Sequence, residues 1–356
     1  MSVLDDLTTD HLPLRARVDA FLDAFLQERI EAEPDQETRE ALAELREFAL
    51  RGGKRIRPLF CYWGWRGAGG APDDPGVVAA AAALELFHTA ALIHDDLIDR
   101  SDLRRGRPTM HVAMSRRHRS AGWRGDSGHF GLSSALLAGD ACLVWSEEIF
   151  HDSPLVQRSK PARALFARLR SSAVYGEFLD LVGEARGGAL QDALKIVRHK
   201  TASYTVRYPL QIGGALAGAD EAVLAAYDYF GLRVGEAFQL RDDLVGFLGS
   251  PEQSGKNAAD DARQGKPTAL IAVARELAGE DQSARLRDLY GASWIGDEEV
   301  AELRDLVAST GAPAVVERMI SDRYAEGVAR LRTAAVHESA LTELEQLATA
   351  SLNRTC

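Results

Sequence analysis

Apolar and charged residues recur at helical spacing along most of the chain. The segment RVDAFLDAFLQERIEAEP, residues 17–34, places apolar residues three or four positions apart and stops at a proline. TREALAELREFALRGG, residues 38–53, repeats the pattern and stops at two glycines, which often end helices. Both segments are therefore predicted to be amphipathic helices.

A longer helix is predicted over residues 77–100, which are apolar until a charged end and should be mostly buried. Further helices are predicted over residues 133–150, 220–248, 267–279 and 297–349. Alternating β-branched runs joined by Asn-Gly or Asp-Gly turns are missing, so strands are not expected. Residues 66–76, 115–132 and 249–267 are rich in Gly, Ser, Asp or Arg and are predicted to be loops. Because we find no repeat and no linker, the simplest prediction is one all-α domain over residues 1–356.

Composition narrows the class of protein. The chain has 356 residues and a net charge of −11, which argues against a general nucleic-acid binder. Its three cysteines follow no metal-ligand spacing, and their odd number argues against a disulfide framework. The first residues lack the apolar core of a signal peptide, and no apolar run reaches the roughly 18 residues of a membrane span. We therefore expect a cytoplasmic protein without stable membrane insertion.

Concentrated charge follows the long apolar helix, in ALIHDDLIDRSDLRRGRPT, residues 91–109. Asp95 and Asp99 are four residues apart, which places both carboxylates on one face of a helix. Such a pair requires a cation, and with no Cys or His to complete a softer set, oxygen ligands favour Mg²⁺. The alternative is an ordinary solvated helix end with charge pairs.

A second acidic pair favours the metal interpretation. EAFQLRDDLVGF, residues 236–247, places Asp242 and Asp243 on another predicted helix, with Gln239 and Gly246 on the Asp242 face. Two Asp-Asp helices that face each other would hold several Mg²⁺ ions. Such a cluster can bind a diphosphate and promote its departure as a leaving group.

Basic segments supply a second kind of site. They are GGKRIRP at residues 52–58, RRGRPT at 104–109, RHKTASY at 198–204 and SGKNAADDARQGKPT at 254–268. Glycine lets the backbone approach an anion, and Lys and Arg neutralise it. Each segment alone is typical of surface charge. Together, in an acidic chain, they indicate two anion sites, one bridged by metal and one formed by basic side chains alone.

The order and spacing of these segments resembles the trans-isoprenyl diphosphate synthases of the polyprenyl synthetase family, most closely the bacterial geranylgeranyl diphosphate synthases. The resemblance runs from about residue 50 to 275 and is collinear through GGKRIRP, ELFHTAALIHDDLID, SDLRRGRPT, LAGDA, GEFLDL, KTASY, FQLRDDLVG and GKPT. It implies an all-α isoprenoid synthase bundle with a central cavity between two Asp-rich helices. It also implies a homodimer that condenses isopentenyl diphosphate with an allylic diphosphate.

The resemblance assigns a role to each matching residue. Three Mg²⁺ ions would be held by Asp95, Asp99 and Asp242, supported by Asp96 and Asp243. The allylic diphosphate would also contact Arg104, Lys200, Lys256 and Lys266, while isopentenyl diphosphate would contact Lys54, Arg57, His88 and Arg105. Thr201 and Gln239 would direct oxygen dipoles at the allylic carbon, and His94 is interpreted as structural.

Product length is predicted from the residues before Asp95. Ala91 and Ala90, four and five positions earlier, are small, whereas a bulky residue there would stop the product near C15 in this family. Phe87 lies about one helical turn deeper, roughly 5 Å, which is close to one isoprene unit. We therefore expect a C20 product, with C15 or C25–C30 still open.

Two residues depart from the family pattern. Gly246 stands where the second motif usually ends in Asp, so the affinity for the allylic diphosphate is in question. Glu177 stands where Gln is more usual, near Asp180.

Other functions remain as alternatives. A terpene cyclase would not need the second basic site, a squalene-type synthase matches less well, and a non-catalytic subunit would typically lose the aspartates.

Overall fold

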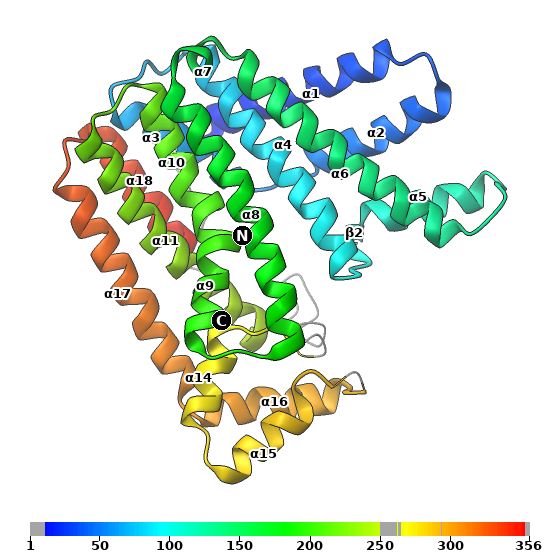
Figure 1. Ribbon diagram of the computed structural model, residues 1–356, viewed down its shortest axis with the longest axis vertical. Coiled ribbons are helices and arrows are strands. Elements are labelled where there is room, and N and C mark those ends of the chain that lie inside the picture. The colour runs from blue at the N-terminus through cyan, green and yellow to red at the C-terminus, as the bar shows by residue number, and fades with distance from the viewer. Residues whose placement is uncertain (1–10, 250–261, 263–264, 293, 353–356) are drawn as a thin grey trace. The chain divides into compact units, whose positions relative to one another are not determined.

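The computed structural model describes residues 11–249, 262, 265–292 and 294–352, and nearly all of its regular elements are helices (Figure 1). The all-α prediction is therefore confirmed. Contacts between Cα atoms group the described residues into two compact units, which we describe separately. The N-terminal unit contains residues 11–164 and 212–218, and the C-terminal unit contains residues 165–211 and 219–352. A single domain over the whole chain stays a prediction.

The N-terminal unit is built around the apolar helix α4, Pro75–Ile98, against which α1, α3 and α6 pack (Figure 1). Its helices are α1 His11–Ala32, α2 Gln36–Leu50, α3 Ile56–Gly67, α4, α5 Met110–Ser120, α6 Ser127–Asp152 and α7 Pro154–Arg158. Asp74 caps the start of α4 by accepting a hydrogen bond from the Gly76 amide, and Pro75 occupies the first turn. The long buried helix predicted over residues 77–100 is confirmed.

The expectation that no segment could span a membrane was too strict. Helix α4 is long and apolar enough to do so by length and composition, because Glu85 is its one carboxylate before Asp95 and Asp96 near its end. In the structure, 78% of its most apolar window is buried inside the protein. The helix therefore serves as the core of its unit.

A short hairpin contradicts the expectation of no strands. β1, Leu103–Arg104, pairs antiparallel with β2, Arg107–Pro108. Arg105 and Gly106 form the turn with φ of 53° and 71°, the positive values that a type I′ hairpin requires. Arginine rarely adopts this conformation, so the turn lacks the usual Asn-Gly signal.

The predicted loop over residues 115–132 and the predicted helix over residues 297–349 also differ from the structure. Residues 115–120 belong to α5 and residues 127–132 to α6, because Met114 and His118 form a buried side beneath the charged one. The predicted helix over residues 297–349 is three helices, since Gly311 adopts φ of 80° between the first two. The loop at 66–76 is confirmed for residues 68–74, while most of 249–267 lies outside the described residues.

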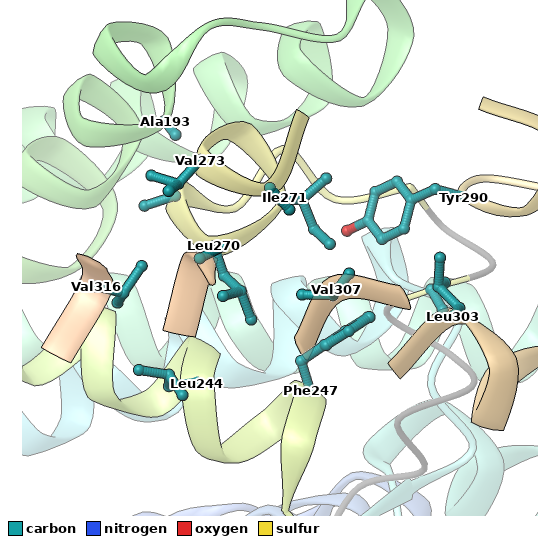
Figure 2. Close-up of a cluster of buried hydrophobic side chains, with 14 of the residues drawn as sticks. Ala193, Leu244, Phe247, Leu270, Ile271, Val273, Tyr290, Leu303, Val307 and Val316 are labelled. Carbon is teal, nitrogen blue, oxygen red and sulfur yellow. The ribbon is translucent and has the colours of Figure 1, made fainter. Parts of the chain in front are cut away.

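The C-terminal unit is organised around α11, Glu221–Leu248, which packs against η1 and α17. Its other elements are α8 Lys160–Arg186 from residue 165, α9 Leu190–Ile196, the π-helix η1 Val197–Arg207, α10 Tyr208–Leu216 up to residue 211, α14 Ala269–Leu277, α15 Glu280–Leu289, α16 Asp297–Ser309, α17 Ala312–Arg332 and α18 Glu338–Leu352. Figure 2 shows Leu244 and Phe247 of α11 within a cluster of buried side chains that includes Leu270 and Val307. This cluster anchors the end of α11 that carries the second acidic pair.

Candidate active site

Three carboxylates crowd the C-terminal end of α4. Asp99 is the capping residue, and its amide donates to the Asp95 carbonyl at 2.8 Å, so the two residues are one turn apart. Asp96 is almost fully buried, with 1% of its surface exposed. The C-terminal end of a helix dipole is negative, and no basic residue of α4 lies in this turn. The cluster therefore requires cationic partners from outside the helix.

Arg104 provides one such partner. The hairpin carries its guanidinium to the end of α4, where Nη2 lies 2.8 Å from Oδ2 of Asp95 and 2.6 Å from Oδ1 of Asp96. Burial alone would lower the pKa of Arg104, but hydrogen bonding and charge from Asp96 and Asp95 outweigh it and raise the pKa. Arg104 is therefore a permanent cation beside the acidic cluster.

A basic pocket of about 290 Å³ lies beside this cluster. It is lined by Phe48, Arg51, Gly52, Leu92, Arg104, Arg105 and Arg107. The left-handed backbone of Arg105 places its Nη1 within 3.0 Å of the Arg51 carbonyl and 2.8 Å of the Gly52 carbonyl. Arg51 and Arg107 also line this pocket and were not predicted, although Arg107 lies within RRGRPT and Arg51 directly precedes GGKRIRP.

His88 belongs to the same electropositive region. It lies on α4 seven residues before Asp95, which is nearly two helical turns and the same face. Burial, together with the positive charges of Arg57, Arg105 and Arg104, lowers the pKa of His88 well below its ordinary value. The N-terminal unit thus brings three of the predicted arginines, Arg57, Arg104 and Arg105, near the neutral imidazole of His88.

Not every cation of GGKRIRP has the same role. Arg55 turns inward with a left-handed backbone, and its guanidinium lies 2.6 Å from Glu85 on α4 and 2.7 Å from Asp19 on α1. This buried network fixes the start of α3, so Arg55 is structural. Arg57, two residues later, is buried near His88, and Lys54 is partly exposed.

The second acidic pair lies on the partly exposed side of α11. Nε2 of Gln239 donates to Oδ1 of Asp243 at 2.7 Å, which joins two predicted site residues one turn apart. Leu240 and Leu244 are buried on the other side of the helix. Asp242 is also partly exposed, and helical spacing places it away from these two leucines. The packing therefore leaves the carboxylates of α11 accessible.

Lys200 and Thr201 lie on η1, whose π-helical turns were not predicted. Nζ of Lys200 lies 2.6 Å from Asp180 and 3.0 Å from Glu177, both on α8. A Cβ at Gly176 would lie only 2.2 Å from the Lys200 amide nitrogen, so glycine permits the close approach of η1 to α8. Glu177 thus gives Lys200 a second carboxylate partner.

The remaining predicted residues have simpler surroundings. Lys266 is partly exposed before α14, and its carbonyl accepts a hydrogen bond from the Tyr290 hydroxyl. Lys256 lies outside the described residues. Phe87 and Ala90 are buried on α4, whereas Ala91 is partly exposed. His94, predicted to be structural, lies against α6, where its Nε2 is 3.3 Å from the Leu136 carbonyl.

The donor set fits Mg²⁺ better than a metal that needs a closed protein cage. Within the described residues, no group of three or more His, Cys, Asp or Glu side chains is arranged to hold a metal ion. Helix α4 offers the neighbouring carboxylates of Asp95 and Asp96, and helix α11 offers those of Asp242 and Asp243. Mg²⁺ commonly binds through one or two carboxylates and completes its shell with water and phosphate oxygens.

The chain is similar to known proteins along most of its length. The sequence model of the polyprenyl synthetase family matches residues 39–308. A (2E,6E)-farnesyl diphosphate synthase of Mycobacterium tuberculosis is 31% identical over 83% of this chain and 78% of its own length. A geranylfarnesyl diphosphate synthase of Aeropyrum pernix is 31% identical over 73% and 77%. A geranylgeranyl pyrophosphate synthase of Corynebacterium glutamicum, solved with isoprenyl diphosphate and magnesium, is 38% identical with a TM-score of 0.90, covering 98% of this chain and all of that one.

Proposed function

We propose that this chain, which belongs to the polyprenyl synthetase family and is a prenyltransferase, condenses isopentenyl diphosphate head-to-tail with an allylic diphosphate to give C20 geranylgeranyl diphosphate. The starter would be dimethylallyl, geranyl or farnesyl diphosphate. The observation that carries the proposal is the position of Arg104, which pairs with Asp95 and Asp96 and also lines the pocket of arginines. An acidic site for a metal-bound diphosphate thus adjoins a basic site that needs no metal.

The acidic residues suit the allylic substrate. Asp95, Asp99 and Asp242 would hold three Mg²⁺ ions, which neutralise the charge that develops on the leaving diphosphate. Arg104 and Lys200 donate hydrogen bonds to the same diphosphate, with Lys256 and Lys266 as further cationic partners. Thr201 and Gln239 direct oxygen dipoles at the allylic carbon, where positive charge develops as its bond to oxygen breaks.

The basic residues suit the second substrate. Arg57, Arg105 and neutral His88 bind the diphosphate of isopentenyl diphosphate, with Lys54 at the partly exposed side. The terminal alkene carbon then bonds to the allylic cation. The new cation loses a proton to the departed diphosphate, which restores a double bond and balances the charge. Preorganised charge, rather than a covalent nucleophile, provides the rate acceleration.

A C20 product follows from the bulk of the side chains below Asp95. Ala91 and Ala90 leave room for the growing chain, and buried Phe87, eight residues below Asp95, closes it at about 12 Å along the helix. The relatives make C15, C20 and C25 products according to their names, so this length is specific to our proposal.

The proposal is tested by omitting one substrate at a time. The chain should consume labelled isopentenyl diphosphate only when an allylic diphosphate and Mg²⁺ are both present. A terpene cyclase would instead release a hydrocarbon from the allylic diphosphate alone, and a non-catalytic subunit would consume neither. Either of those results would refute the proposed condensation.

We also propose a cytoplasmic homodimer. Helix α6 exposes a row of apolar side chains, Leu132, Leu136, Leu137 and Val144, with Leu137 67% exposed. Such a row on a long helix suits an isologous contact with a second copy. Light scattering after size exclusion should give a dimer mass, and Leu137→Glu should give a monomer.

A further inference from the structure

Glu236 is a carboxylate in the middle of α11 with none of its surface exposed. Nε of Arg198, on η1, lies 2.5 Å from its Oε1, and Nε of Arg323, on α17, lies 2.8 Å from its Oε2. Arg233, one turn away on α11, lies 3.4 Å from Oε2. A buried charge is costly unless it is paired in this way. Glu236 therefore joins η1 and α17 to α11 at one point.

The backbones of η1 and α11 also touch beside this ion network. A Cβ at Gly235 would lie 2.6 Å from the Ala202 Cα, so only glycine fits next to Glu236. At the other end of η1, Arg207 donates to both carboxylate oxygens of Asp228 at 2.8 and 3.0 Å. Close packing and two ion pairs thus fix how η1 lies along α11.

The position of Arg198 connects this network to the proposed chemistry. Arg198 precedes Lys200 by two residues and Thr201 by three, within the same π-helix. A π-helix of this length is rare, and ion pairs with α11 and α8 hold this one in place. We infer that Glu236 is a positioning residue: through Arg198 it fixes the turn of η1 that presents Lys200 and Thr201 to the allylic diphosphate. The substrate in this inference rests on the proposed function.

Two variants and one matched control test the inference kinetically. Arg198→Met removes the η1 partner but leaves Glu236 with Arg323 and Arg233, and the Arg198 side chain is already 42% exposed, so the fold should persist. Glu236→Gln removes the charge. Glu317→Gln is the control, because Glu317 of α17 pairs with Arg241 of α11 and does not involve η1.

We expect both variants to lower kcat/KM for the allylic diphosphate by about tenfold to a hundredfold, because displaced catalytic groups cost that much. The KM for isopentenyl diphosphate should stay within about twofold, since its proposed ligands lie in the N-terminal unit, and the double variant should be no worse than Glu236→Gln. A rise of the KM for isopentenyl diphosphate by tenfold or more, or kinetics like those of Glu317→Gln, would overturn the inference.

Amide hydrogen exchange over residues 197–207 supplies a readout that does not depend on activity. Exchange should be faster in Arg198→Met and Glu236→Gln than in Glu317→Gln, because η1 would lose a contact that holds it. Unchanged exchange in both variants would overturn the inference even if the wild-type chain proved to be inactive. Inactive wild-type protein with faster exchange would instead count against the proposed function and leave the positioning of η1 supported.

Discussion

Nη2 of Arg104 lies 2.6 Å from Oδ1 of Asp96, whose side chain is only 1% exposed. The arginine comes from a two-residue strand, whereas the aspartate belongs to a packed helix. The buried carboxylate therefore fixes the guanidinium beside Asp95. We therefore propose that Asp96 orients the cation of the proposed allylic site.

Replacing this carboxylate should weaken catalysis without replacing a proposed metal ligand. Asp96→Asn should lower kcat/KM for the allylic diphosphate about tenfold to a hundredfold, because the guanidinium loses its charged anchor. Steady-state kinetics at saturating Mg²⁺ measures this. Asp102→Asn, an exposed carboxylate before the same hairpin, is the matched control and should behave like wild type. Equal kinetics for both variants would refute the role of Asp96.

The lowered pKa of His88 should make stability depend on pH. The unfolded chain binds a proton near pH 6.5, whereas folded His88 binds it only at a lower pH. Stability from this residue is therefore complete above about pH 6.5 and falls as the pH drops, by up to about 1.4 kcal/mol per pH unit. The free energy of unfolding of His88→Gln, measured in urea at pH 7.5 and 5.5, should fall less than that of wild type. Exposed His129→Gln serves as the control, and a curve for His88→Gln parallel to wild type would contradict the prediction.

Opening the floor of the proposed chain-length pocket should lengthen the product. Phe87→Ala should shift the product beyond C20, at a stability cost of about 3–5 kcal/mol for a buried Phe→Ala change. Ala91→Phe should shift the product toward C15. Phe60→Ala, an equally buried change on α3, controls for the cavity itself. If Phe87→Ala gives the same product length as wild type, Phe87 is not the floor. If Phe60→Ala lengthens the product as much as Phe87→Ala does, the cavity alone explains the change and Phe87 is again not the floor.

Restoring the missing carboxylate of the second motif should strengthen metal binding. Gly246 follows Asp242 by four residues on α11, so Gly246→Asp places a third carboxylate on the Asp242 face. The Mg²⁺ concentration for half-maximal rate should fall severalfold. Gly246→Ala separates this effect from helix propensity, because alanine should add about 0.5–1 kcal/mol of stability and leave the Mg²⁺ dependence unchanged. A lower Mg²⁺ requirement in both variants would contradict a role for the added carboxylate.

The helical spacing of apolar residues predicted several of the long helices, and physical causes explain why other elements were not predicted. The segment that forms α4 and the one that forms α11 show clear apolar spacing, so both were predicted within a few residues. The hairpin at Leu103–Pro108 was missed because its turn uses arginine in a left-handed conformation. No helix was predicted over residues 197–207, because VRHKTASYTVR has no clear apolar repeat, and these residues form the π-helix η1.

Some residues of the candidate site could be predicted from the sequence, and others could not. Residues four apart on a helix lie on one face, so Asp95 and Asp99 could be placed together from the sequence alone. The sequence alone could not separate the arginines that form structural ion pairs from those that lie at the candidate site. Arg55 turns inward to Glu85 while Arg57 lies near His88, and only the backbone conformation separates the two. Arg51 and Arg107 become pocket residues only when α2 and the hairpin meet.

The most direct test of the proposed function is the length of the product that the wild-type chain makes. Purified protein would be incubated with Mg²⁺, labelled isopentenyl diphosphate and, in turn, dimethylallyl, geranyl and farnesyl diphosphate, and the products would be dephosphorylated and sized. We predict a dominant C20 alcohol from each starter and none when Mg²⁺ is chelated. No elongated product from any starter would contradict the proposed condensation, and a different dominant length would contradict the assignment of Phe87.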